Sequence, residues 1–175
     1  MAIENKNLQE RFEFRNIKPE EYPEAAEIEA VCFPPNEACT RERMYQRVMA
    51  AKEFFLVAVD RGTGKLAGFI NGIATNEQYL RDDFYTDASL HDPDGENIMI
   101  CSLDVLPEYR LLGLARALVF SYAQREKERG KKRLVLTCLA EKVGMYKKFG
   151  FHDLGESASV WGDEKWHEMD MVLNI

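Results

Sequence analysis

Residues 103–115 read LDVLPEYRLLGLA and join two segments with different hydrophobic patterns. Upstream, residues 98–106 are almost continuously apolar, which is typical of a strand covered on both faces of a sheet. Pro107 ends that strand, and apolar residues then recur at helical spacing to about Arg129, where Gly130 provides a C-terminal stop. The stretch is therefore predicted to form the turn between a central strand and an amphipathic helix.

The same turn has the chemistry of an anion-binding site. The first backbone N–H groups of a helix have no partner within the helix and lie at its positive end. Gly113 and Ala115 remove side-chain bulk there, and Arg110 can add charge-assisted hydrogen bonds. The pattern is neither the GxGxxG of dinucleotide sites nor a P-loop, which needs Lys followed by Ser or Thr. A pyrophosphate on bare backbone is the favoured interpretation, and a plain helix start is the alternative.

The segments on either side of this unit predict a mixed sheet. Strands are expected at residues 11–17, 54–59, 65–75, 134–139, 151–154 and 165–173, and further helices at residues 19–31, 40–51 and 142–149. A parallel strand–helix–strand crossover lies between antiparallel hairpins. Gly68 and Gly72 indicate a bulge or a close backbone approach, and the polar residues 76–97 indicate a long loop. The predicted fold class is α/β (α+β), one domain over residues 1–175, with a mostly antiparallel mixed sheet flanked by helices.

Composition and charge narrow the class of protein. The chain has 175 residues, of which 46% are hydrophobic and 30% charged, as in one globular domain. Its net charge of −7 argues against sequence-independent nucleic-acid binding and is compatible with a cationic ligand. No apolar run approaches the ~20 residues of a membrane span, and the N-terminus lacks a signal-peptide core, so a cytoplasmic protein without a membrane partner is expected. The cysteines and histidines lack metal-ligand spacing, so no metal site is predicted.

Two downstream motifs extend the pattern of the turn. They are LTC at residues 136–138 and MYKKFGF at residues 145–151. With these motifs the sequence resembles the GCN5-related N-acetyltransferase (GNAT) superfamily. Within it the chain most resembles the arylalkylamine (serotonin-type) N-acetyltransferases, through CFPPNEA at 32–38, GFI at 68–70, SLHDPDG at 89–95 and WHEM at 166–169. The resemblance therefore extends over residues 32–173.

The resemblance implies a GNAT fold and an enzyme that transfers an acetyl group from acetyl-CoA to a primary amine. Backbone groups of Leu103, Asp104 and Val105 would pair with the pantetheine arm. The pyrophosphate would be surrounded by Leu111, Leu112, Gly113, Leu114, Ala115 and Arg116, together with the Arg110 side chain already noted. Lys148 matches a basic position near the cofactor.

Tyr146 matches the tyrosine that, in this family, protonates the departing CoA thiolate. Its side chain suits that role, because a phenol with an ordinary pKa of about 10 keeps its proton until a basic thiolate forms. The alternative is a core tyrosine that packs on the sheet.

The chain departs from the serotonin-type pattern where the amine must lose its proton. That group carries two histidines on the central strand, and the matching residues here are Met99 and Cys101. Another base is needed, and the candidates are Glu96 at the strand entrance, His91 and Glu37 in the loops, and Asp104 on the strand. Each of them could instead be solvated or structural, and Glu96 is kept as a weak catalytic candidate. Cys101 as a covalent nucleophile would need a nearby base that the sequence does not show.

The expected acceptor is a small-molecule amine, such as an arylalkylamine or a polyamine. Residues 32–39 and 76–97 would shape its pocket, whereas Trp161 and Trp166 are expected to pack the last hairpin. Two alternatives remain: a protein or peptide amine as acceptor, and a catalytically inactive CoA-binding sensor domain. Both a monomer and a homodimer are compatible with the sequence.

Overall fold

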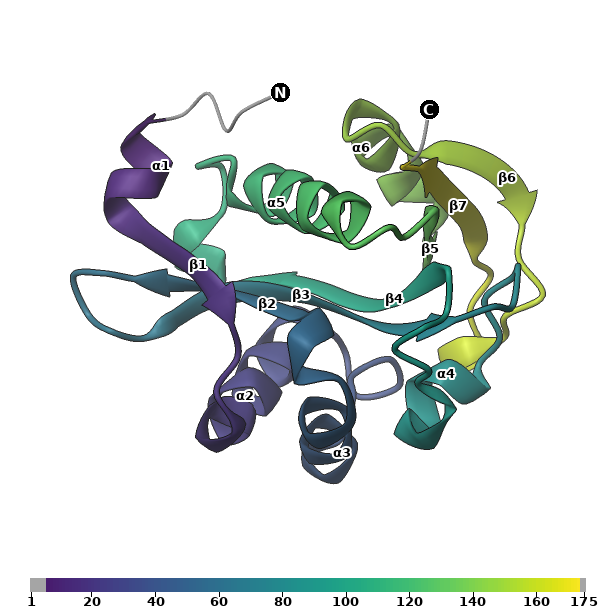
Figure 1. Ribbon diagram of the computed structural model, residues 1–175, viewed down its shortest axis with the longest axis horizontal. Coiled ribbons are helices and arrows are strands. Elements are labelled where there is room, and N and C mark those ends of the chain that lie inside the picture. Colours follow the sequence, from purple (N-terminus) through teal and green to yellow (C-terminus); the bar gives the residue numbers. More distant parts are fainter. Residues whose placement is uncertain (1–5, 174–175) are drawn as a thin grey trace.

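The computed structural model describes residues 6–173, and its centre is a seven-stranded sheet in the order β1-β2-β3-β4-β5-β7-β6 (Figure 1). The strands are β1 Phe12–Asn16, β2 Phe55–Asp60, β3 Leu66–Thr75, β4 Asn97–Val105, β5 Arg133–Cys138, β6 His152–Glu156 and β7 His167–Val172. β4 and β5 pair in parallel, and each other pair of neighbours in this order is antiparallel. The predicted mixed, mostly antiparallel sheet is confirmed.

Helices cover both faces of the sheet. On one face lie α5 Leu114–Glu128 and α6 Val143–Lys148; on the other lie α2 Tyr22–Cys32, α3 Arg41–Ala51 and α4 Asp83–Thr86 (Figure 1). A short helix, α1 Lys6–Arg11, precedes β1. The 3₁₀ segments are η1 Pro19–Glu21, η2 Lys52–Phe54, η3 Ala88–Leu90, η4 Pro107–Tyr109, η5 Ala140–Lys142 and η6 Trp161–Asp163. No helix among residues 6–173 is both long enough and apolar enough to cross a membrane.

Local sequence explains where the main helices begin and what they bury. The Thr40 side chain accepts a hydrogen bond of 3.2 Å from the Arg43 N–H, which is the predicted cap of α3. The α2 and α3 side chains form one apolar core with the adjoining face of β2 and β3. On the opposite face, Leu118, Val119 and Tyr122 of α5 are fully buried in the larger core.

β4 contains a bulge in its pairing with β3. Asn71 faces Ser102 and Gly72 faces Ile100, so Cys101 is the extra residue. A Cβ on Gly72 would lie 2.9 Å from the carbonyl oxygen of Met99, and a Cβ on Gly68 would meet the carbonyl oxygen of Asp104, so the β4 backbone leaves no room for a side chain at either position. The close backbone approach predicted from the glycines of β3 is confirmed.

The parallel pair is joined over only part of its length. β5 pairs with β7 along its whole length, but on its other edge it pairs with β4 only at Asn97–Met99. In the described part of the chain, the β5-facing edge of β4 from Ile100 to Val105 therefore has no strand partner. This opening between β4 and β5 positions the candidate site.

Three features differ from the sequence expectations. α1 was not predicted, although Leu8 is buried there. Residues 76–97 contain α4 and η3 instead of a continuous loop, because a four-residue helix is too short to show a hydrophobic period. The closing hairpin forms as predicted, but β7 lies between β5 and β6, so that β6 is the edge strand.

Candidate active site

The β4–α5 turn, residues 110–113, follows η4 and leads directly into α5. Leu111 has a φ of 65° and Gly113 a φ of 84°, so two residues of the turn are left-handed. Successive backbone N–H groups in such a turn form a concave anion site, and the helix start adds its positive end. The side chain of Leu111 is fully exposed, so the groups that this turn offers to a ligand are mainly those of its backbone. The structure thus brings the predicted pyrophosphate-binding groups together.

Arg110 has a contact that the sequence did not indicate. Its Nε donates a hydrogen bond of 3.1 Å to the carbonyl oxygen of Val105. Sγ of Cys32 approaches the same oxygen at 3.4 Å. The Val105 carbonyl therefore already has partners. Of the three residues predicted to pair with the pantetheine arm, Leu103 and Asp104 are the better candidates.

Tyr146 lies on α6, where the rings of Phe149 and Phe151 contact it edge-on at centroid distances of 6.0 and 5.6 Å. Burial, and then the charges of Cys138 on β5 and Asp104 on β4, raise the pKa of the Tyr146 phenol. Residues of both separated strands thus contribute to the electrostatic environment of this hydroxyl. Its raised pKa keeps the phenol protonated at neutral pH.

The predicted basic groups lie at the surface. Lys148 is exposed at the end of α6, and Arg116 is exposed in the first turn of α5 with its guanidinium 4.6 Å from the centroid of the Phe120 ring. An exposed cation can meet a polyanionic ligand without first leaving an internal ion pair, and of these two residues Arg116 lies at the start of a helix.

The loops expected to shape the acceptor pocket meet at Trp161. Its Nε1 donates a hydrogen bond of 3.0 Å to the carbonyl of Glu37 in the α2–α3 loop, residues 33–40. Its ring lies 5.0 Å from that of Tyr85 on α4. The Tyr85 hydroxyl is 2.7 Å from Oγ1 of Thr137 on β5, so Tyr85 connects Trp161 and the two loops to the sheet. Trp166 packs as expected, donating from Nε1 to the Trp161 carbonyl at 2.8 Å.

Glu37 is a half-buried carboxyl in this assembly. Burial raises its pKa, and the negative charges of Glu164 and Glu141 raise that pKa further. Glu141 belongs to η5, directly before α6, and Glu164 to the β6–β7 connection. Carboxylates from three segments thus act on one another near the loop that Trp161 holds, and the guanidinium of Arg43 lies 5.8 Å from the centroid of the Trp161 ring. Aromatic rings and negative charge in one region suit a cation with an apolar body.

The other base candidates have different surroundings. Oε1 of Glu96 lies 2.6 Å from Nζ of Lys132 in an exposed ion pair. Glu96 precedes the paired end of β4, about 23 Å from Leu103 at the ordinary rise of a strand, so the structure does not bring it to the turn. Nδ1 of His91 accepts from the Ala74 N–H at 3.1 Å, and burial together with Lys131 lowers the His91 pKa. His91 is therefore a neutral structural acceptor.

The two positions that replace the strand histidines are also unsuited to proton removal. Met99 is fully buried in the core. Burial raises the pKa of the Cys101 thiol, which points to the carbonyl of Phe84 at 3.7 Å. A protonated thiol is neither a base nor an activated nucleophile.

A buried polar cluster between the sheet and α2–α3 escaped the sequence reasoning. Arg47 on α3 is only 4% exposed, and its guanidinium donates to Oδ1 of Asn71 at 3.4 Å and to the carbonyl of Tyr85 at 3.1 Å. Its position was a usable signal, because Arg47 falls three residues after Met44 on the apolar face of the predicted helix.

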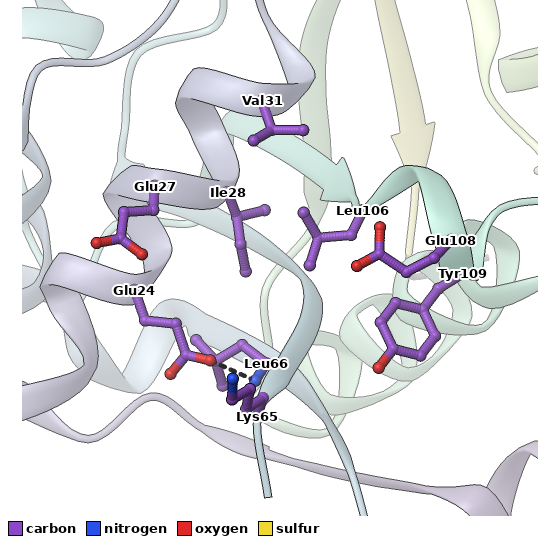
Figure 2. A pocket seen from close by; sticks show the side chains of 9 residues that line it. All are labelled: Glu24, Glu27, Ile28, Val31, Lys65, Leu66, Leu106, Glu108 and Tyr109. Atoms are coloured by element: carbon purple, nitrogen blue, oxygen red, sulfur yellow. Dashed lines mark hydrogen bonds between the residues drawn. The ribbon is translucent and has the colours of Figure 1, made fainter. Parts of the chain in front are cut away.

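A separate groove of about 300 Å³ lies between α2, the start of β3 and η4 (Figure 2). It has an apolar floor and a mostly acidic rim, lined by Glu24, Glu27, Ile28, Val31, Lys65, Leu66, Leu106, Glu108 and Tyr109. Oε1 of Glu24 accepts from the Leu66 N–H at 2.7 Å (Figure 2). None of the predicted site residues lines this groove, so it is distinct from the opening between β4 and β5.

Solved structures share the fold of this chain. The GphF GNAT-like decarboxylase in complex with isobutyryl-CoA has a TM-score of 0.79 at 18% identity, over 93% of this chain and 100% of that one. The ribosomal-protein-S18-alanine N-acetyltransferase from Escherichia coli has a TM-score of 0.67 at 17% identity, over 94% and 95% of the two chains. A GNAT superfamily phosphinothricin acetyltransferase from Sinorhizobium meliloti, in complex with AcCoA, has a TM-score of 0.66 at 15% identity, over 93% and 89%.

Such identities show the shared fold, which confirms the GNAT fold expected from the sequence. No curated protein matches the sequence. A profile of the acetyltransferase (GNAT) family, however, matches residues 14–151, most of the chain. The chain belongs to the acetyltransferase (GNAT) family.

Proposed function

We propose that this protein is an acetyl-CoA-dependent N-acetyltransferase that transfers the acetyl group directly to the primary amine of a small molecule. The observation that carries the proposal is the edge of β4 that has no strand partner among the described residues and that ends at the left-handed β4–α5 turn. Asp104 of this edge also acts electrostatically on Tyr146. One long opening thus combines an extended backbone edge, an anion-binding turn and a protonated acid. Membership of the family supports acyl transfer as the reaction type.

The residues present fit acetyl-CoA in two ways. The free backbone edge at Leu103 and Asp104 can accept the pantetheine arm as an added strand. The β4–α5 turn and the start of α5 offer backbone N–H groups to the pyrophosphate, and Arg116 and Lys148 add exposed positive charge. When bound, acetyl-CoA supplies a thioester, an activated acyl group.

Tyr146 is assigned as the general acid for the CoA sulfur. Its raised pKa keeps the hydroxyl protonated at neutral pH, so it is available to donate to the CoA sulfur as negative charge develops there. Backbone N–H groups at the free edge of β4 would stabilise negative charge on the acyl oxygen, as in other acyl-transfer sites.

Glu37 is assigned as the group that removes the amine proton, directly or through water. In the described residues its carboxyl forms no ion pair, unlike Glu96, and it is less buried than Asp104. Its raised pKa makes the carboxylate a stronger base than a fully solvated one. The hydrogen bond from Trp161 fixes its backbone.

Arylalkylamines and polyamines are the proposed acceptors. Trp161 and Tyr85 provide aromatic rings, the Trp161 ring is hydrogen-bonded to the loop that carries Glu37, and Glu141 and Glu164 add negative charge near Glu37. An ammonium group gains from both features when it is desolvated between them.

The test is acetyl-CoA thiol release with phenylethylamine, tryptamine, spermidine and lysine peptides, with CoA binding measured by calorimetry on the same preparation. Turnover of the small amines, lost in Tyr146→Phe while CoA still binds, is the expected result. Turnover of peptides alone would assign the acceptor to proteins. CoA binding without turnover on any amine would favour a sensor domain, and absence of CoA binding would overturn the proposal.

A further inference from the structure

Two carboxyl side chains meet inside the protein where the proposed mechanism does not use them. Asp104 on β4 is 1% exposed, and Glu29 on α2 is 4% exposed. Among the described residues, both carboxyl oxygens of Asp104 and Oε2 of Glu29 are buried without a hydrogen-bond donor. Buried polar atoms without partners are strongly unfavourable, so this arrangement needs an explanation.

A shared proton explains it. The two carboxyls lie within hydrogen-bonding reach of each other, and Glu29 is the main charged neighbour of Asp104. Two carboxylates are both acceptors and repel, whereas a carboxylic acid donates to a carboxylate. Burial, followed by the charge of Glu29, raises the pKa of Asp104 well above its ordinary value.

Charge balance in the cluster points to the same protonation state. Arg47, which cannot lose its proton, is the buried guanidinium that acts electrostatically on both carboxyls. One cation with two carboxylates would leave a buried net negative charge, whereas one cation with one carboxylate is neutral.

The other titratable groups that face the pair are neutral. Burial raises the pKa of Cys39 in the α2–α3 loop to about 11 and also raises the pKa of Cys32 on α2. The pKa of the Tyr146 phenol on α6 and that of the Cys101 thiol on β4 are raised by burial too. These groups neither add charge to the cluster nor supply a further cation.

The pair joins the two halves of the candidate site. Oε1 of Glu29 accepts a hydrogen bond of 3.2 Å from the Cys39 N–H, two residues after Glu37 in the α2–α3 loop. Asp104 belongs to the free edge of β4. A proton between them therefore connects the loop that carries the proposed base to the strand that would hold the acyl donor.

We propose that Asp104 and Glu29 share one proton at neutral pH and act as positioning residues that hold the α2–α3 loop against β4. The kinetic consequence rests on the proposed function, whereas the shared proton does not. The pair belongs to the folded protein and is present before any substrate binds.

Glu29→Gln and Glu29→Ala form the matched pair of variants. The Gln side chain can still accept from the Cys39 N–H, and its amide can donate to an ionised Asp104, so the link is kept without the shared proton. The Ala side chain loses both contacts. Asp104→Asn removes the same proton from the other side.

Infrared difference spectra test the proton itself. Wild type minus Asp104→Asn, and wild type minus Glu29→Gln, should both contain the carbonyl band of a protonated carboxylic acid at neutral pH. Absence of that band from both differences would overturn the proposal whether or not the protein proves to be an acetyltransferase.

Unfolding measurements give the second readout. The wild-type pair holds a proton that the unfolded chain releases above a pKa of about 4, so its contribution to stability is lost as pH rises through the raised folded pKa. The free energy of unfolding of Glu29→Gln should therefore increase relative to that of the wild type as pH rises from about 5 to about 9. A difference that does not change with pH contradicts the shared proton.

Kinetics on an accepted amine give the third readout. Glu29→Ala should raise the amine KM about 10-fold or more while the Kd for CoA stays within about twofold, and Glu29→Gln should restore most of the amine KM. Equal damage in both variants, or an equal change in CoA affinity, would contradict a positioning role. A wild-type protein without turnover would refute the proposed function and leave the first two readouts to decide on the proton.

Discussion

The guanidinium Nε of Arg110 is hydrogen-bonded to the carbonyl oxygen of Val105 at 3.1 Å, so the β4–α5 turn is tied to the last residue of β4. This contact uses an N–H that a lysine side chain cannot offer in the same position. The turn therefore depends on this residue for its shape as well as for positive charge.

The first prediction separates these two contributions. Arg110→Lys keeps the charge and loses the bond to Val105, so CoA affinity should fall about 5- to 10-fold, as expected for one lost hydrogen bond. Arg110→Gln should weaken CoA binding further, and the additional loss should shrink at high salt because it is electrostatic. Calorimetry at two salt concentrations checks this. Full affinity in the lysine variant would show that the bond does not shape the site.

The second prediction concerns Gly113, whose φ is 84°. Gly113→Ala should destabilise the protein by about 1 kcal/mol through left-handed strain and should also weaken CoA binding, because the turn must shift. Gly130→Ala is the control, since Gly130 has the same φ of 84°, lies at the far end of α5 and has open space around it. Thermal unfolding should show similar losses for both variants. A CoA defect in Gly130→Ala would indicate a global effect.

The third prediction tests the acid. Tyr146→Phe keeps the ring contacts with Phe149 and Phe151 and removes only the hydroxyl, so kcat should fall about 10²- to 10⁴-fold with little change in stability or CoA affinity. Steady-state kinetics and calorimetry on one preparation measure both quantities. An unchanged kcat would assign protonation of the thiolate to water or to another group.

The fourth prediction is a pH profile. Glu37 must be ionised to accept a proton, so kcat/KM should fall as pH drops through its raised pKa. Glu164→Gln removes the larger of the two neighbouring charges that raise this pKa, and should therefore move the acidic limb of the profile to lower pH. Glu37→Gln should eliminate that limb and most of the activity. A limb that stays in place in Glu164→Gln would have to belong to another group or to the amine.

The central strand, its turn and α5 could be predicted from sequence because their signals are local. A change from continuous to helical apolar spacing occurs at Pro107, and the Thr40 cap of α3 is likewise visible within four residues. The glycines of the partner strand β3 indicated the bulge at Cys101, because a glycine within a strand often marks a bulge or a close backbone approach.

The site itself depends on contacts between distant segments, and these have no local signal. Glu37 lies with Glu141 and Glu164, each more than a hundred residues away along the chain. Asp104 falls in an apolar strand pattern, and only the packing of α2 on the sheet reveals its partner Glu29. The sequence also singled out Glu96, which the structure places directly before the end of β4 that pairs with β5, away from the β4–α5 turn.

The place of β7 between β5 and β6 has a consequence for how the chain is made. Within residues 6–173, every pairing of β6 is with β7, and β5 has β7 as its partner along its whole length. A nascent chain that has not yet released residues 167–172 from the ribosome leaves β5 as an open strand edge and β6 without any neighbour. Such edges recruit other chains, so the interval before β7 emerges is when this protein most needs protection from aggregation by a chaperone.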